Sequence, residues 1–234
     1  MQLTFATYNI HKAVGLDRRR DPERILAILR EIDADVVALQ EADRRIGRRE
    51  SVLPRSHIED YTPYRPVPLN HRPDSLGWHG NALLVRRSIA IVEAGIVPLP
   101  TLEPRGAIRA DLLVAGKRIR VVGMHLDLSG LRRRQQLRAI LAHLDRCDHL
   151  CPAVVMGDCN EWGTRRGATA EFHPPWRVLA PGFSFPSRRP VARFDRIAIT
   201  SEWHLDQAAV HHSALAAKGS DHLPVWARLA LPKI

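Results

Sequence analysis

The chain has 234 residues, of which 45% are hydrophobic and 26% charged, and it carries a formal net charge of +10. This composition excludes a disordered or fibrous chain, and the length predicts a single domain over residues 1–234. The positive charge favours anionic partners such as nucleic acid, a phosphorylated metabolite or a phospholipid head group, although a solvated surface rich in Arg would produce the same balance.

The cysteines and the N-terminus suggest where the protein works. Cys147, Cys151 and Cys159 are too few for a disulfide framework, which favours a reducing compartment. The spacing of Cys147 and Cys151 is compatible with a metal pair, but we favour packing as small apolar residues. A strand-like run starts at Leu3 without a signal peptide, and no apolar run approaches the ~20 residues that span a bilayer. We therefore expect a cytoplasmic protein without stable membrane insertion.

The first part of the chain predicts a strand, a helix and a second strand. The strands are the apolar runs Leu3–Tyr8 and Val36–Leu39. Between them, Asp21 is the expected N-cap of a helix with Pro22 at its first position. The helical stripe consists of Ile25, Ile28, Leu29 and Ile32. Residues Asp43–Arg72, rich in Pro, Arg and His, are predicted to form a long loop.

The middle of the chain predicts consecutive strands with short turns between them. These are Ala82–Val85, Ile89–Val97, Ala107–Val114 and Ile119–His125. Strands joined by a turn as short as Ala115-Gly116 pair in antiparallel fashion. A purely parallel sheet is therefore excluded, and the fold class is α/β with mixed pairing.

The last part of the chain predicts a second helix and three more strands. The helix begins near Ser129 and ends before Pro152, and its apolar face carries Leu137, Ile140, Leu141 and Leu144. Its basic start at Arg132–Arg134 is unfavourable for the helix dipole. The strands are Ala153–Met156, Phe194–Ile199 and Pro224–Leu231, and residues Glu161–Pro190 are predicted as a second long loop.

The predicted strands repeatedly end in acidic, amide or imidazole side chains. These include Asn9, Glu41, His125, Asp127, Asp158 and Asn160, and the tail adds Asp195, Ser220, Asp221 and His222. If Glu41, Asp158, Asp195 and Asp221 converge, their mutual repulsion requires a cation. Carboxylate and amide oxygens without thiolates favour Mg²⁺ or Mn²⁺ over Zn²⁺. A basic protein with such a site is suited to phosphoryl chemistry.

Six segments, taken in order, resemble the endonuclease/exonuclease/phosphatase superfamily over residues 3 to 231. They are TYNIH, LQE, MHLD, GDCN, RFDRI and SDHLP. The resemblance implies a four-layer α/β/β/α sandwich with two packed, mixed but largely antiparallel sheets. It also implies a metal-dependent hydrolase of phosphoester bonds, with its site at one edge of the sandwich.

The same resemblance implies a role for each matching residue. Glu41 would be the principal Mg²⁺ ligand, Asn9 would position the site and touch metal or phosphate, and Asp221 would be a second metal ligand. Asp158 would orient or deprotonate the attacking water, and Asn160 would bind a phosphate oxygen. His222 and His125 would contact the scissile phosphate, with Asp195 fixing the tautomer of His222. Cys159, in the variable position of GDCN, would pack.

Other residues are candidates for substrate contact. His11 stands where the abasic-site endonucleases place an acidic metal ligand, and it could touch metal or substrate. The abasic-site branch also has a different residue at the position of His125, so both positions argue against that branch. Asn81 opens a strand and either holds a loop or lines the site. Arg105 and Arg109 would contact phosphate unless they are surface residues. Trp78 and His79 would form a wall for a base or head group unless they pack in the core.

The reaction class is better specified than the substrate. Runs of Arg at 18–20 and 132–134 favour a nuclease, whereas the 6% aromatic content offers few stacking platforms. A phospholipid or small-molecule phosphodiesterase is the alternative, since the TYNIHK start is similar to small bacterial members associated with phospholipid metabolism. The inositol phosphatase interpretation is weaker, because the Lys-rich phosphate-binding stretch expected of that class is not recognisable in this sequence. A non-catalytic anion-binding protein is a third possibility, but no motif position is broken.

Overall fold

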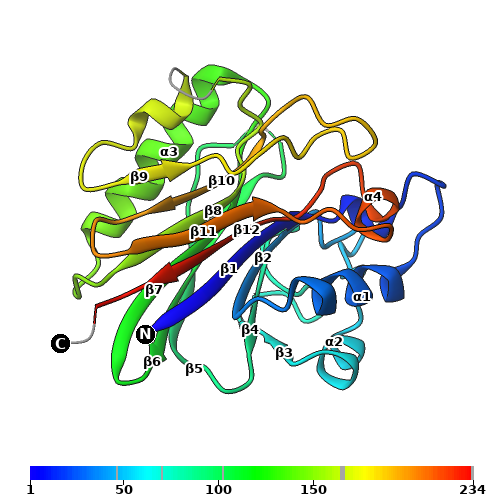
Figure 1. The fold of residues 1–234 in the computed structure, drawn as a ribbon, viewed down its shortest axis with the longest axis horizontal. Helices are drawn as coiled ribbons and strands as arrows, with labels where there is room; N and C mark the ends of the chain where they lie inside the picture. The colour runs from blue at the N-terminus through cyan, green and yellow to red at the C-terminus, as the bar shows by residue number, and fades with distance from the viewer. Residues whose placement is uncertain (46, 70, 102, 164–166, 233–234) are drawn as a thin grey trace.

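The computed structural model describes residues 1–45, 47–69, 71–101, 103–163 and 167–232. Two six-stranded sheets pack face to face, with α3 covering one sheet and α1 and α2 the other (Figure 1). The predicted four-layer α/β/β/α sandwich is therefore confirmed. Among the described helices, none is long and apolar enough to cross a membrane.

The two sheets are assembled from the following elements. The strands are β1 Gln2–Asn9, β2 Val36–Gln40, β3 Tyr64–Pro66, β4 Ala82–Arg86, β5 Ala90–Val97, β6 Gly106–Val114, β7 Lys117–His125, β8 Ala153–Asp158, β9 Arg177–Leu179, β10 Asp195–Ile199, β11 His204–Val210 and β12 Val225–Ala230. The helices are α1 Pro22–Ile32, α2 Arg55–Tyr61, α3 Gly130–Asp145 and α4 Ala216–Gly219, with short 3-10 turns η1 His11–Ala13 and η2 Ala168–Glu171.

Each sheet contains one parallel pair joined by a helix. The first sheet has the order β11-β12-β1-β2-β4-β3, and the second has β5-β6-β7-β8-β10-β9. β1 pairs in parallel with β2 through α1, and β7 pairs in parallel with β8 through α3, whereas the other pairs are antiparallel. A parallel pair places the carboxyl ends of both strands at the same sheet edge. This repeated arrangement brings four strand ends toward one edge of the sandwich.

The core is divided into three apolar layers, as alternation along the strands requires. On β1, Phe5 faces the space between the sheets, whereas Ala6 and Tyr8 face α1. Val122 and Met124 on β7 face α3 in the third layer. The middle layer packs the two sheets against each other and so holds the strand ends of both sheets in a fixed relative position.

Local sequence explains the ends of α1 as predicted. The Asp21 side chain accepts a hydrogen bond from the Arg24 backbone nitrogen at 3.0 Å, and Pro22 occupies the first turn. The helix stops at Asp33, whose φ of 49° is left-handed. The buried stripe of this helix comprises Ile25, Leu26, Ile28 and Leu29.

The basic start of α3 is compensated by a tertiary contact. Arg133 is buried, and its guanidinium lies 3.2 Å from the Glu161 carboxylate beyond β8. It also donates to the Leu128 carbonyl at 2.6 Å, so it satisfies a backbone acceptor just before the helix. The unfavourable effect of the dipole on this cation is therefore offset by a buried ion pair.

Every predicted strand and both predicted helices are present, but the two predicted loops are more structured than expected. Asp43–Arg72 contains α2 and β3, and Glu161–Pro190 contains η2 and β9. β11 was not predicted either, because it is a half-exposed edge strand with polar residues on both faces. These segments have weak periodicity of their own, and their neighbours in the sheets supply the pairing that orders them.

We expect Asp111→Asn to destabilise the fold by about 3 kcal/mol, because it leaves Arg120 buried without its partner. Asp111 is fully buried on β6 and accepts from Arg120 at 2.8 Å. Burial raises the pKa of Asp111, but Arg120, Arg109 and Arg118 outweigh it and lower the net pKa. The contribution is therefore complete above the unfolded-state pKa of ~3.9 and is lost as the pH falls through the lower folded-state pKa.

The measurement is urea unfolding of wild type and Asp111→Asn at pH 7 and at acidic pH. Asp60→Asn, an exposed position on α2, is the control and should be neutral. A difference between wild type and Asp111→Asn that grows toward acidic pH would contradict the assignment.

Candidate active site

Residues from both sheets meet where the parallel strands end. Asn9 is the last residue of β1, Glu41 follows β2, His125 ends β7 and Asp158 ends β8. Asp195, which begins β10, pairs directly with Asp158 across the antiparallel ladder. The strand-end convergence that the sequence suggested is thus present in the fold.

Asp158 lies at the centre of this cluster and is almost fully buried. Its Oδ2 accepts from Asn9 Nδ2 at 3.0 Å, which joins the two sheets, and its Oδ1 accepts from the Asn160 backbone nitrogen at 2.9 Å. The same Oδ2 lies 3.4 Å from His125 Nε2 and 3.6 Å from His222 Nε2. Burial raises the pKa of Asp158, but His222, His125 and the Asn160 N–H outweigh it, so the group is held as a carboxylate.

His222 and Asp195 form a buried pair. His222 Nδ1 lies 2.9 Å from Asp195 Oδ2, which also accepts from Ser184 Oγ at 2.6 Å. The ring of Phe185 packs on His222 with its centroid 4.9 Å away. Burial lowers the pKa of His222, but the Asp195 and Asp158 charges outweigh it and raise this pKa to about 10. Asp195 thereby orients the ring and favours its protonated form.

Asn160 and Asp221 occupy the margins of the cluster. Asn160 has a left-handed φ of 48°, and its Nδ2 donates to the Leu126 carbonyl at 2.9 Å. Asp221 is half-exposed, with Oδ1 4.0 Å from His11 Nδ1. His11 itself contacts the Val14 carbonyl through Nδ1 at 3.1 Å. Both margins leave polar atoms facing the cluster.

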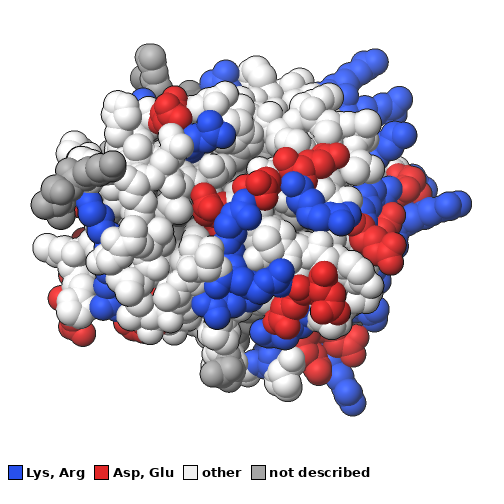
Figure 2. Space-filling view, turned by 60° about the horizontal axis from the view of Figure 1, so that its bottom comes forward, with Lys and Arg blue, Asp and Glu red and all other residues white. Residues whose placement is uncertain are grey.

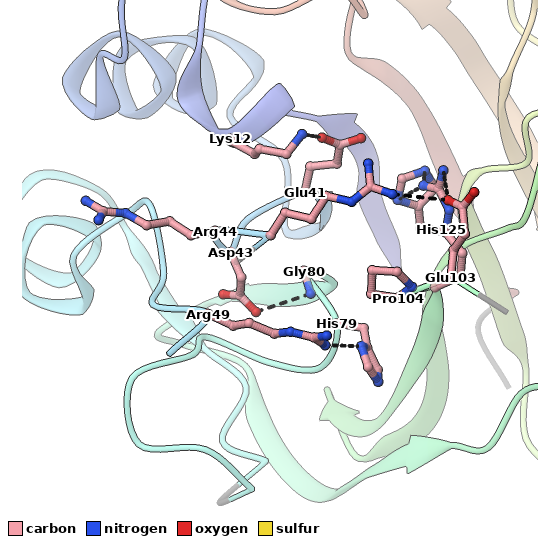
Figure 3. Close-up of a pocket in the computed structure, with 12 residues that line it drawn as sticks. Lys12, Glu41, Asp43, Arg44, Arg49, His79, Gly80, Glu103, Pro104 and His125 are labelled. Atoms are coloured by element: carbon pink, nitrogen blue, oxygen red, sulfur yellow. Dashed lines mark hydrogen bonds and ion pairs between the residues drawn. The ribbon is translucent and has the colours of Figure 1, made fainter. Parts of the chain in front are cut away.

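Glu41 offers a carboxylate suited to a hard cation. It is partly exposed, has a left-handed φ of 55°, and is paired with Lys12 (Figure 3). Burial raises the pKa of Glu41, but His125, Lys12 and His11 outweigh it and lower the pKa. Glu41, the Asn9 amide and the Asp221 carboxylate are oxygen donors of the kind that Mg²⁺ prefers. These residues therefore fit a divalent cation.

A second arrangement of potential ligands lies deeper. One ligand atom each of Asp158, Asp195 and His222 lies within 4.8 Å of the others, and all three are buried. In this set, however, His222 Nδ1 is already bonded to Asp195, and both carboxylates accept from protein donors. A metal there would have to replace these bonds, so we favour the Glu41 side for a cation.

Arg105 and Asn81 lie near the cluster in different ways. The Arg105 guanidinium donates to His125 at 2.9 Å, so it reaches the site. Asn81 is buried and donates to the Trp78 carbonyl at 3.3 Å. A Cβ on Gly106, which pairs with His125, would lie 2.9 Å from the Trp78 ring and 3.5 Å from Asn81. Asn81 and Trp78 thus pack behind the strand end, whereas His79 lines the pocket beside Glu41.

Arg109 does not join the cluster, contrary to its prediction as a substrate contact. It lies on β6 opposite Val122, three residues beyond Gly106, which corresponds to ~10 Å along the strand. Its side chain is buried and pairs with Glu93 and Cys147 beside α3. The error arose because sequence proximity to Arg105 does not indicate which sheet face or which end of the strand a residue occupies.

Lys12, Ser184 and Arg49 were missed by sequence reasoning. Lys12 directly follows the TYNIH segment, so its position was a usable signal. Ser184 contacts Asp195 from the loop between β9 and β10, and Arg49 contacts His79 at 2.8 Å from the loop after β2. No local pattern marks these two, because only the folded loops bring them to the site.

A buried carboxylate–imidazole site at the edge of a four-layer sandwich, next to an oxygen-rich donor set, defines a class of phosphoester hydrolases. The sequence model of the Endonuclease/Exonuclease/phosphatase family matches residues 6–222. The chain belongs to this family, whose members are metal-dependent hydrolases acting on phosphoester bonds.

Solved structures share the fold at low sequence identity. A family protein from Bacteroides vulgatus superposes with a TM-score of 0.78 at 18% identity, covering 99% of this chain and 100% of that chain. D. rerio TDP2 complexed with single strand DNA product has a TM-score of 0.76 at 17% identity, covering 98% and 99%. The human Nocturnin catalytic domain with bound sulfate has a TM-score of 0.73 at 16% identity, covering 99% and 94%. No curated protein sequence matches the chain.

Proposed function

We propose that the protein is a Mg²⁺-dependent phosphodiesterase in which a water molecule attacks phosphorus at the Asp158–His222 centre. The observation that carries this proposal is the buried arrangement of Asp158 between Asn9, His125 and the His222–Asp195 pair. It combines a carboxylate acceptor at Asp158 with an imidazolium donor at His222, two groups suited to the hydrolysis of a phosphodiester.

The roles of the residues follow from their protonation states. Asp158, held as a carboxylate, accepts the proton of the attacking water and orients it. As the bond from water to phosphorus forms, the P–O bond to the leaving group breaks, and the departing oxygen takes a proton from Nε2 of His222, whose pKa is raised while Asp195 holds Nδ1. His125, steadied by Arg105, is placed beside the same carboxylate. The Nδ2–H of Asn160 that is not bonded to Leu126 donates a hydrogen bond to a phosphate oxygen.

A cation would be held by Glu41, with Asn9 and Asp221 as further oxygen donors. When bound, Mg²⁺ supplies charge neutralisation and polarisation at the phosphate. Lys12 is paired with the Glu41 carboxylate, so a metal ion bound there would share this carboxylate with Lys12. Mn²⁺ has the same preference for oxygen ligands and is the alternative metal.

We infer a nucleic acid substrate, with a phospholipid head group or small phosphodiester as the alternative. Support comes from the charge of +10 and from the D. rerio TDP2 structure, which holds a single strand DNA product. Figure 2 shows Lys and Arg gathered mainly over the half that carries α1 and α2, interleaved with acidic residues. The Lys and Arg residues on this half are the ones that could contact a phosphate backbone.

We expect the purified protein to hydrolyse bis(p-nitrophenyl) phosphate in Mg²⁺, to lose this activity in EDTA, and to regain it when Mg²⁺ is restored. The physical reason is that a divalent cation held by Glu41 would neutralise negative charge at the phosphate. Release of p-nitrophenol is the measurement. Activity that is indifferent to EDTA would contradict the metal assignment.

Nicking of supercoiled plasmid in Mg²⁺ distinguishes the two substrate classes. Nicking by wild type but not by Asp158→Asn supports the nuclease, because the variant excludes a contaminating enzyme. If the small diester is hydrolysed but the plasmid stays intact, the phospholipid or small-molecule alternative is favoured.

A further inference from the structure

A pocket beside Glu41 and His125 is not used by the mechanism above. It has about 60 Å³ of space for water-sized molecules and opens to solvent. Its walls come from the loop after β2, the turn before β4 and the segment before β6 (Figure 3). Glu41 and His125 form the side that faces the catalytic centre. The pocket is therefore a continuation of the proposed site, on the side away from His222.

The far walls of the pocket are cationic. Arg45, Arg49 and Arg105 line it together with the acidic residues Asp43 and Glu103. Asp43 is committed to the protein, since it accepts from Ser75 Oγ at 2.6 Å and from the Gly80 nitrogen at 3.2 Å. Glu103 lies 3.5 Å from Arg105 and 3.6 Å from Arg45, so one carboxylate serves two guanidinium groups.

Arg49 has no carboxylate partner among the described residues. Its Nη1 lies 2.8 Å from Nδ1 of His79 (Figure 3). Burial, Arg49 and Arg72 lower the pKa of His79, so the ring is neutral and accepts this hydrogen bond without cancelling the charge. Arg49 also has a left-handed φ of 53°, a conformation that a non-glycine residue rarely adopts. The loop thus presents the Arg49 guanidinium to the pocket without a carboxylate paired to it among the described residues.

We propose that this pocket binds a second phosphate of the substrate, next to the scissile one, with Arg49 and Arg45 as its ligands. The inference rests on the proposed function. Guanidinium groups bind phosphate oxygens through paired, charge-assisted hydrogen bonds. A cationic pocket beside a phosphodiesterase centre is therefore suited to binding a second phosphate of the substrate. The neutral ring of His79, packed against Trp78 at 4.3 Å between centroids, adds an aromatic surface.

A polynucleotide is the substrate class that fits both features. It repeats phosphates along its backbone and carries bases that stack on aromatic rings. A phospholipid with one phosphodiester would leave the Arg49 pocket empty and has no base to place against His79. The enzyme should therefore favour an oligonucleotide that has a phosphate adjoining the one it cuts.

The experiment compares a thymidine dinucleotide that has a single phosphodiester with the same dinucleotide phosphorylated at its 5′ or its 3′ end. We expect kcat/KM of wild type to be roughly tenfold higher for one of the phosphorylated forms. In Arg49→Gln and in Arg45→Gln this ratio should fall toward one. Arg177→Gln, at an exposed position on β9, is the control and should keep the wild-type ratio.

Each outcome bears on the proposal. Circular dichroism of each variant checks that it folds. Because Arg49 and Arg45 are tested separately, the proposal can still be tested if one of the two variants fails to fold. Hydrolysis of bis(p-nitrophenyl) phosphate with no preference for either phosphorylated dinucleotide, or with a preference that survives both variants, overturns the second-phosphate site alone. Hydrolysis of phosphatidylglycerol vesicles, with none of the dinucleotides, overturns the polynucleotide assignment. No hydrolysis of bis(p-nitrophenyl) phosphate in Mg²⁺ or Mn²⁺ overturns the proposed function and this inference with it.

Discussion

Asp158→Asn is expected to lower kcat for bis(p-nitrophenyl) phosphate by about 10²- to 10⁴-fold, the range for loss of a general base. The amide has nearly the shape of the carboxylate, so the hydrogen bond from the Asn160 backbone can survive. The variant loses the negative charge that accepts a proton from water and that balances His222. The effect should therefore appear in kcat with little change in the fold.

The control for this prediction is Asp148→Asn, at an exposed position after α3. It makes the same chemical change far from the strand-end cluster and should retain wild-type kcat. Thermal unfolding of both variants checks stability independently of activity. An Asp158→Asn enzyme with full kcat would show that another group activates the water.

Asp195→Asn is expected to reduce kcat/KM by about 10²- to 10⁴-fold and to move the alkaline limb of its pH profile to lower pH. Asp195 is fully buried and is the first electrostatic partner that raises the pKa of His222 to about 10. A group with a raised pKa is protonated below that pKa and loses its proton as the pH rises through it. Removing the Asp195 charge lowers this pKa, so His222 stops donating at a lower pH.

The pH dependence of kcat/KM separates this role from a loss of stability. A variant that is less stable but still folded keeps the alkaline limb of its profile at the wild-type pH. Ser184→Ala is the matched comparison, since it removes the hydroxyl that donates to Asp195 at 2.6 Å but keeps the Asp195 charge. Its alkaline limb should stay close to that of wild type. An Asp195→Asn profile with an unchanged limb would contradict the orienting role of Asp195.

The sequence was most informative where chemistry and secondary structure coincide. Asn9, Glu41, His125 and Asp158 each follow a buried strand, and an apolar run that ends in a polar residue is visible in one dimension. The N-cap at Asp21 was equally visible, because capping depends on local residues. The roles of these residues in catalysis and the single-domain organisation stay predictions.

The sequence was least informative where a residue is placed by its neighbours. Arg105 reaches His125 whereas Arg109, four positions later, pairs with Glu93 and Cys147, because the two residues lie at different positions along the strand. The β3 and β9 segments have little periodicity and are ordered by pairing with β4 and β10. Edge strands of this kind are defined by the partner strand more than by their own residues.

The sequence by itself determined the family, the alternation of strands and helices, and the set of polar residues at the strand ends. These are properties of short segments, since hydrophobic periodicity and motif spacing act within a few residues. Only the tertiary structure decided that Asp158 is shared by Asn9, His125 and His222, and that Arg49 lines the pocket beside Glu41 with no ion-pair partner among the described residues. The physical reason is that burial, pKa and charge compensation depend on groups brought together from distant parts of the chain.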